Sequence, residues 1–254
     1  MPPTDLELLA IQAEGALDAA GRLAGRYGIT IACARGAHAM WIGADVPDAA
    51  AAALAAAFAA TAPARDPAEP PAALDRCRRI LGSGRAVEYR AGPSFVFHDA
   101  VPPSPGVRIE RSDLPLGGPL GAALRGANPG NWQPVEWDEL LDGRLGPWTM
   151  VLEGDRAVSI CHTPGPLSPR GAECGVWTQP GFRGRGHAAA TAAAWAAILR
   201  PTGRVLFYAT DADNRSSQRV AERLQLRPIG WTWRLHAPDP ADEPVHPLSA
   251  LRRR

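Results

Sequence analysis

The sequence predicts a mixed α/β (α+β) protein that is built in two parts and followed by a short tail. Apolar residues at helical spacing alternate with short strand-like runs along most of the 254 residues. A stretch with three prolines and no periodicity, Ala100–Gly106, separates the two parts. We therefore expect a smaller N-terminal α+β domain at residues 1–104, a second domain at 105–236, and a tail rich in proline and arginine at 237–254.

The N-terminal part is predicted to hold three helices and two hairpins. Apolar and alanine-rich runs at helical spacing predict helices at about 4–25, 48–60 and 72–81. The first hairpin is expected to turn at Arg35-Gly36, and the second at Gly92-Pro93.

The second part begins with a short strand at 107–110, followed by two predicted helices at about 116–125 and 135–141. Further elements then alternate along the chain. Strands are expected at 148–153, 157–162, 172–178, 204–210 and 228–235, and helices at 186–199 and 214–224.

The composition excludes several classes of protein. With 46% apolar and 21% charged residues, the chain is not of the intrinsically disordered type. A formal net charge of +1 argues against a dedicated nucleic-acid binder. All 27 basic residues are arginine, which excludes Schiff-base chemistry and a lysine nucleophile.

The cysteines and the apolar tracts predict a cytoplasmic protein with no membrane partner. Cys33, Cys77, Cys161 and Cys174 are not spaced as a metal or redox motif, so a reducing compartment is expected. The longest apolar tract, Ala49–Ala60, is too short to span a bilayer, and no signal peptide is evident at the N-terminus.

One glycine-rich run, Arg183–Ala188, lies between a predicted strand and a predicted helix. The first N–H groups of a helix have no partner within the helix, and small residues let a ligand approach them closely. This arrangement favours an anion such as a phosphate. A second run with similar spacing, Arg79–Gly84, follows a predicted helix, where carbonyl groups are exposed instead. Only the first run therefore predicts a phosphate site.

The stretch Thr178–Ala188 resembles the acyl-CoA pyrophosphate loop of the GNAT superfamily of N-acetyltransferases. Leu206–Leu224 resembles the fifth strand and following helix of that family, and Val107–Asp113 resembles its first strand. The resemblance covers about residues 107–236. It implies a mixed, mostly antiparallel sheet, flanked by helices and splayed between its fourth and fifth strands. The N-terminal part resembles no family.

The resemblance also implies that acetyl-CoA, or another acyl-CoA, is the co-substrate and that no metal takes part. The pantetheine arm would pair with the exposed edge of the fourth strand, and the pyrophosphate would lie on the loop. The cofactor-binding residues implied in this way are Val176, Trp177, Thr178, Arg183, Gly184, Arg185, Gly186, His187, Ala188, Asn214 and Ser217.

Transfer of an acyl group to an amine requires a base, because an alkyl amine with a pKa of about 10 is only about 0.1% neutral at pH 7. Glu173 is the first candidate, since related enzymes often place a carboxylate there, and His162 is the second. The amine would attack the thioester directly, so the resemblance implies no covalent enzyme intermediate.

The departing thiolate requires a proton, and here the chain departs from the family. Many members carry a tyrosine on the helix after the fifth strand, where this chain has Val220 and Ala221. The general acid is therefore left open. Tyr208 and the hydroxyls of Ser216 or Ser217 are candidate substitutes. Release of a free thiolate without an acid is the alternative, since thiols have a pKa of about 8.5.

The predicted function is an acyl-CoA-dependent N-acyltransferase with a primary amine as acceptor. The alternative is a non-catalytic CoA-binding regulatory module of the same fold, which the missing tyrosine favours. An RNA-binding role for Arg183–Gly186 and the terminal arginines fits poorly with the near-neutral charge. Three roles are open for the N-terminal part: it shapes the acceptor pocket, mediates a homodimer, or is a degenerate half-copy of the same architecture.

Overall fold

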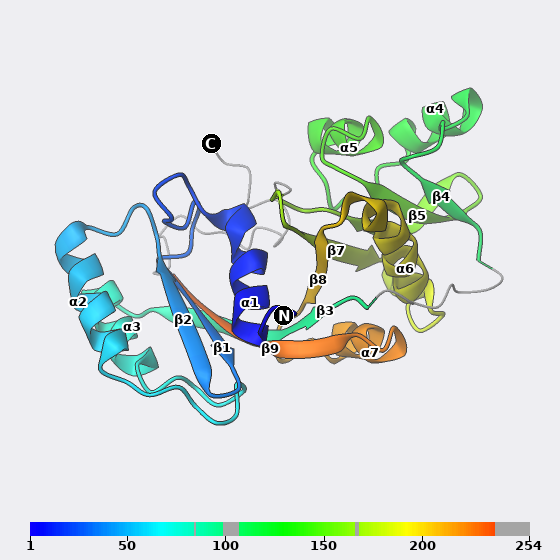
Figure 1. Ribbon diagram of the computed structural model, residues 1–254. Helices are drawn as coiled ribbons and strands as arrows, with labels where there is room; N and C mark the ends of the chain where they lie inside the picture. Colours follow the sequence, from blue (N-terminus) through cyan, green and yellow to red (C-terminus); the bar gives the residue numbers. More distant parts are fainter. Residues whose placement is uncertain (84, 99–106, 166–167, 237–254) are drawn as a thin grey trace. The chain divides into compact units, whose positions relative to one another are not determined.

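A computed structural model describes residues 1–83, 85–98, 107–165 and 168–236 (Figure 1). The described chain forms two compact units. Unit 1 contains the described residues up to 95, together with 209–215 and 228–236. Unit 2 contains those from 96 to 208, together with 216–227. The predicted boundary segment and the predicted tail lie outside the described residues, so the domain limits at 104 and 236 stay predictions.

Unit 1 is built on four strands in the order β2-β1-β9-β3. β1 pairs antiparallel with both β2 and β9. The strands are β1 (Ile29–Ala34), β2 (Ala37–Ile42), β3 (Glu88–Val96) and β9 (Arg227–His236). The helices are α1 (Asp5–Ala13), α2 (Asp48–Ala59) and α3 (Leu74–Gly82), with a 3-10 turn η1 (Glu14–Ala16) after α1.

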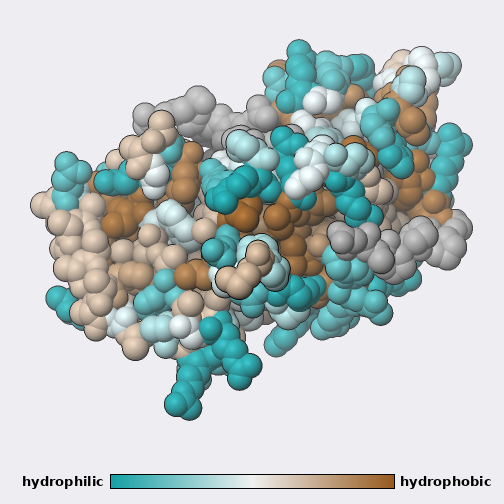
Figure 2. All heavy atoms as spheres, in the orientation of Figure 1, coloured by the Kyte–Doolittle hydropathy of each residue, from teal (hydrophilic) through white to brown (hydrophobic). Residues whose placement is uncertain are grey.

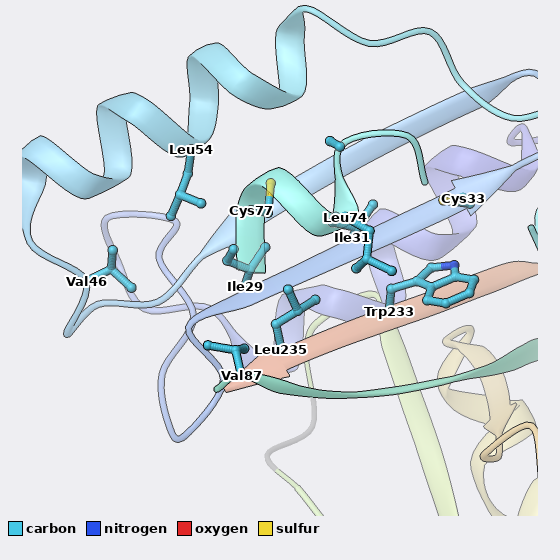
Figure 3. Close-up of a cluster of buried hydrophobic side chains, with 11 residues drawn as sticks. Ile29, Ile31, Cys33, Val46, Leu54, Leu74, Cys77, Val87, Trp233 and Leu235 are labelled. Carbon is cyan, nitrogen blue, oxygen red and sulfur yellow. The ribbon is translucent and has the colours of Figure 1, made fainter. Parts of the chain in front are cut away.

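The core of unit 1 joins side chains from distant parts of the sequence (Figure 3). Ile29 and Ile31 of β1 pack with Leu235 of β9, and all three are fully buried. Leu54 of α2 and Cys77 of α3 cover them. The solvent side of α2 is mildly apolar because its residues are mostly alanine (Figure 2). Burial of the core side chains Ile29, Ile31 and Leu235 contributes to the stability of unit 1.

The predicted helix at 4–25 is wrong in length. α1 begins after Thr4, whose hydroxyl accepts the Glu7 N–H while the Glu7 carboxylate accepts the Thr4 N–H. The helix ends at Ala13. Gly21 and Gly25 then adopt φ values of +74° and +106°, which glycine tolerates and a helix does not. The hairpin at Arg35-Gly36 is confirmed by the β1–β2 pairing.

The predicted hairpin at Gly92-Pro93 is also wrong, because both residues lie inside the single strand β3. A Cβ atom at Gly92 would come 1.8 Å from the Thr210 carbonyl oxygen. The Thr210 N–H donates to the Pro93 carbonyl at 3.2 Å, and the Ala212 N–H donates to the Ala91 carbonyl at 2.8 Å. Glycine is therefore needed here for the close approach of another chain segment and not for a turn.

Unit 2 is built on five strands in the order β8-β7-β6-β5-β4. All pairs are antiparallel except β7–β8, which is parallel. The strands are β4 (Ile109–Arg111), β5 (Trp148–Glu153), β6 (Arg156–His162), β7 (Gly171–Thr178) and β8 (Val205–Ala209). The helices are α4 (Gly118–Gly126), α5 (Pro134–Leu141), α6 (His187–Leu199) and α7 (Arg215–Arg223), with 3-10 turns η2 (Pro180–Phe182) and η3 (Arg200–Thr202). This mostly antiparallel sheet flanked by helices is the predicted fold class.

The two faces of the unit 2 sheet are covered by different helices. On one face, Met150 and Ile160 pack in a buried cluster with Trp137 of α5 and Leu124 of α4. On the other face, the Thr149 hydroxyl donates to a main-chain carbonyl of α6 at 2.7 Å. We call these the α4/α5 face and the α6 face. Because side chains alternate along a strand, each residue of β5, β6 and β7 can be assigned to one of them.

None of the described helices combines the length and the apolar character that crossing a bilayer would require.

Candidate active site

The strands β7 and β8 separate partway along their length. Their parallel pairing begins at Gly171 opposite Val205 and ends at Cys174 opposite Tyr208. β7 continues to Thr178, and beyond Cys174 it pairs only with β6. We call the point at Cys174 and Tyr208 the fork. The predicted splay between the fourth and fifth strands of this sheet is confirmed.

Beyond the fork, one edge of β7 carries main-chain N–H and carbonyl groups that form no hydrogen bond with β6. The Gln179 N–H donates to the Val158 carbonyl of β6 at 2.9 Å. Main-chain groups of alternate residues point to opposite sides of a strand, so those of Trp177 also face β6. The N–H and carbonyl groups of Val176 and Thr178 therefore point toward the side that β8 has left. This is the arrangement that strand-like pairing with a pantetheine amide would need.

The loop after β7 leads into the N-terminus of α6. Gly184 and Gly186 have φ values of +79° and +86°, and Gly186 is the N-cap of the helix. The Ala190 N–H is bonded to the Gly186 carbonyl at 3.1 Å. The N–H groups of His187, Ala188 and the next residue precede that first intrahelical bond, so they are donors for an anion.

Both arginine side chains of the loop are bonded to the loop itself. Arg183 Nε donates to the Thr178 carbonyl at 3.1 Å, and Arg185 Nη2 donates to the Gly181 carbonyl at 3.2 Å. The Arg185 guanidinium also lies 4.8 Å from the centre of the Phe182 ring. These bonds use only one donor of each guanidinium, and both arginines remain exposed.

A third arginine, which the sequence analysis missed, lies against the loop. A Cβ atom at Gly186 would come 3.1 Å from Cζ of Arg223, at the end of α7. No carboxylate pairs with Arg223 in the part of the chain that the structure describes. Nothing in the local sequence links these residues, because only the packing of α7 brings them together. A positive charge at a helix N-terminus strengthens its attraction for an anion.

The two candidate bases lie on the same face of the sheet. His162 is the β6 partner of Gly175, the first residue of β7 beyond the fork. Glu173 is two residues before Gly175, so strand alternation places it on the same face and diagonal to His162. Because the Trp132 ring contacts His162 edge-on at 5.8 Å, this is the α4/α5 face. Burial lowers the pKa of His162 to about 4, so its imidazole is neutral at physiological pH.

The candidate acid lies on the other face. The Tyr208 hydroxyl is 2.6 Å from the Ser217 hydroxyl of α7. Tyr208 is the β8 partner of Cys174. Cys174 lies between Glu173 and Gly175 in β7, so its side chain points away from the α4/α5 face, and Tyr208 lies with it on the α6 face. Burial raises the pKa of Tyr208 well above its ordinary value. The phenol therefore stays protonated at neutral pH and keeps a proton that it can donate.

Comparison with known families assigns this architecture. Residues 128–227 match the family model described as the acetyltransferase (GNAT) domain. These residues include the fork, the loop and all three candidate catalytic side chains. Residues 128–227 are a GNAT acetyltransferase domain.

The solved structures that match part of the chain include proteins described as GNAT-family acetyltransferases. A GNAT-family protein from Novosphingobium aromaticivorans is 26% identical, with a TM-score of 0.43, over 60% of this chain and 66% of that chain. A GNAT acetyltransferase from Colwellia psychrerythraea is 9% identical, with a TM-score of 0.46, over 66% and 63%. A GCN5-related N-acetyltransferase from Sphaerobacter thermophilus is 18% identical, with a TM-score of 0.45, over 65% and 56%. The chain thus spans about two thirds or less of the length of these structures. No curated protein matches the sequence.

One predicted cofactor-binding residue, Asn214, lies in unit 1, whereas the fork lies in unit 2. Asn214 is exposed, directly precedes α7, and its N–H donates to the Asp211 carbonyl at 3.1 Å. It belongs to unit 1, so its predicted role beside the cofactor stays a prediction. Within the described residues, no three His, Cys, Asp or Glu side chains gather in a group that could hold a metal.

Proposed function

We propose that the protein is an acyl-CoA-dependent N-acyltransferase that moves an acetyl group from acetyl-CoA to a primary amine by direct attack. The observation that carries this proposal is the fork, where β7 leaves β8 and runs on into the α6 loop. The freed edge of β7 offers main-chain groups to the pantetheine amides. The N–H groups at the start of α6 and the Arg223 guanidinium offer positive charge to the pyrophosphate.

The two faces of the fork divide the work of catalysis. Deprotonating an alkyl amine at pH 7 requires about 4 kcal/mol, which a positioned base can offset. The neutral imidazole of His162 and the carboxylate of Glu173, on the α4/α5 face, would take this proton directly or through a water molecule. The Val176 N–H, on the open edge of β7, would stabilise the developing oxyanion. The Tyr208–Ser217 hydroxyl pair, on the α6 face, would donate a hydrogen bond to the departing sulfur.

The test of this proposal compares two glycines of one loop by calorimetric titration with acetyl-CoA. Alanine at Gly186 is strained at φ +86° and would push against Arg223. A Cβ atom at Gly181 would have no other atom within 4 Å, and this glycine lacks a positive φ. Gly186→Ala should raise the Kd for acetyl-CoA at least about tenfold, since it disturbs several charge-assisted bonds. Gly181→Ala should change the Kd less than about twofold, within the range of neutral surface substitutions.

Two outcomes would contradict the assignment. One is the absence of binding by the unmodified chain at millimolar acetyl-CoA. The other is unchanged affinity in Gly186→Ala at an unchanged melting temperature.

A second candidate function is a CoA-binding module without catalysis. It is favoured by the replacement of the family's tyrosine with Val220 and Ala221 on α7. A thiol-release assay over simple alkylamines, arylalkylamines, polyamines, amino acids and peptide N-termini separates the two candidates. Turnover of any amine rejects the non-catalytic module.

A further inference from the structure

Four side chains in unit 2 bury polar atoms that have no hydrogen-bonding partner among the described residues. They are the amide of Asn131, the indole N–H of Trp148, both ring nitrogens of His162 and the Nδ1 atom of His187. His162 is 3% exposed and Trp148 is 1% exposed. Buried polar groups are almost always paired, so those of Asn131, Trp148 and His162, which lie close to the fork or to its neighbours, require an explanation.

Two of these residues, Trp148 and His162, lie beside the fork, and Asn131 is next in sequence to a residue that contacts His162. Trp148 and His162 are direct partners in the β5–β6 ladder. His162 is in turn the partner of Gly175, which has no side chain to fill the α4/α5 face in front of it. Asn131 precedes Trp132, whose ring lies 5.8 Å from the His162 ring. The unpaired groups of Trp148 and His162 therefore lie on the α4/α5 face at the fork, and Asn131 lies next to Trp132 on the same side.

The side chains next to His162 on this face are aromatic. The Trp132 ring contacts Trp137 at 5.6 Å and Trp177 at 5.9 Å, between ring centres. The unpaired groups of Asn131, Trp148 and His162 are an amide, an indole and an imidazole with a lowered pKa, so none of these three carries a formal charge at neutral pH. Glu173, diagonal to His162, is the one carboxylate that strand alternation places on this stretch of β7.

Three carboxylates in and directly after α5 have partners on their own helix pair. Glu136 accepts the Gln133 N–H at the start of the helix, at 3.0 Å. Asp138 and Asp142 are both paired with Arg125 of α4. Asp138 and Asp142 thus face the positive charge of Arg125, which reduces the attraction that these two carboxylates would exert on a polycationic acceptor.

We propose that Asn131, Trp148 and His162 form the acceptor site, and that the acceptor is an amine carried on an uncharged, flat apolar body with hydrogen-bonding capacity, such as an arylalkylamine. The amine end is directed to His162 and Glu173, and the body lies among the tryptophans. Offset or edge-on stacking holds such a body, while the amide of Asn131 and the indole of Trp148 bond its polar substituent. This inference rests on the proposed acyl transfer.

The specificity test measures kcat/KM with acetyl-CoA for tyramine, phenethylamine, spermidine and glutamate. The two arylalkylamines should exceed spermidine and glutamate at least about tenfold, the discrimination that one well-matched pocket provides. A preference for spermidine or glutamate would overturn the inference and leave the acyltransferase proposal standing. Acetyl-CoA binding without turnover of any amine would instead overturn both.

A matched pair of asparagines separates a binding role from a structural one. The Asn128 amide donates to the Trp132 carbonyl at 3.0 Å and accepts the Gly130 N–H at 2.8 Å, whereas the Asn131 amide bonds nothing described. Asn131→Leu should leave the melting temperature unchanged or higher, keep the Kd for acetyl-CoA, and raise the KM for tyramine about tenfold. Asn128→Leu should lower the melting temperature by about 2 °C or more. A destabilised Asn131→Leu, or one with unchanged KM, would show that Asn131 does not serve the acceptor.

Discussion

At the scale of single residues, Tyr208 combines burial with one short hydrogen bond to Ser217. A buried phenol with a raised pKa does not ionise at neutral pH, so it serves as a donor to negative charge that develops nearby. That role is what a departing thiolate requires. It would replace the tyrosine that α7 lacks.

The phenol predicts a specific kinetic effect. Tyr208→Phe should lower kcat about tenfold to a hundredfold and leave the Kd for acetyl-CoA unchanged, because only the interaction with the leaving sulfur is removed. Steady-state kinetics with titration calorimetry would measure both. Tyr89→Phe, at an exposed tyrosine of unit 1, is the control and should behave as the unmodified chain does. Equal kcat values for the two variants would exclude the proposed role.

Single-residue reasoning from sequence selected part of the proposed site. It selected Glu173, His162 and Tyr208 through the resemblance to the GNAT family and their places in its elements, and the loop glycines by spacing. It did not select Arg223, Asn131 or Trp148, because each meets its neighbours only through packing between elements.

At the scale of elements, β7 serves two partners in succession. Its first half pairs with β8 and its second half with β6, so main-chain groups at Val176 and Thr178 have no strand beside them. An unpaired edge in the middle of a sheet is unusual, since strand edges normally acquire partners. A bound pantetheine arm would complete the ladder.

This edge can be tested by removing one donor at a time. Val176→Pro deletes an N–H that faces the open side, so it should raise the Kd for acetyl-CoA at least about tenfold with little change in melting temperature. Trp177→Pro deletes an N–H that faces β6, so it should destabilise the fold by about 3 kcal/mol. Calorimetric titration and thermal melting would distinguish them. Loss of folding in both variants alike would argue against an open edge at Val176.

Element prediction failed where glycine was interpreted without its surroundings. The apolar spacing of residues 4–25 continues past Ala13, yet Gly21 and Gly25 turn the chain through positive φ values. Gly92-Pro93 has the composition of a turn, but the glycine admits the Thr210 carbonyl beside a continuous strand. Glycine permits both uses, and only the neighbouring chain decides between them.

At the scale of the whole molecule, a buried neutral histidine makes stability depend on pH. The pKa of His162 is about 4 in the fold, against an ordinary value of 6.5. Below pH 6.5 the unfolded chain binds a proton that the folded chain does not, so acid favours unfolding. This contribution to the free energy of unfolding is intact above pH 6.5 and falls by up to about 3 kcal/mol as the pH decreases to 4.

Denaturant unfolding at several pH values would measure this effect. His162→Leu removes the titrating group, so its free energy of unfolding should decrease less between pH 6.5 and pH 4 than that of the unmodified chain. Parallel curves for the two proteins would mean that His162 is not held neutral by burial.

The sequence by itself determined the alternation of helices and strands in unit 2, the glycine-rich loop before α6 and the resemblance to the GNAT family. These features are local, since periodicity and loop composition act over a few neighbouring residues. The tertiary structure alone decided where β7 and β8 part, which face holds His162 and Glu173, and that Arg223 lies against Gly186. Those outcomes depend on strand register and on the packing of helices distant in the chain, which no local pattern encodes.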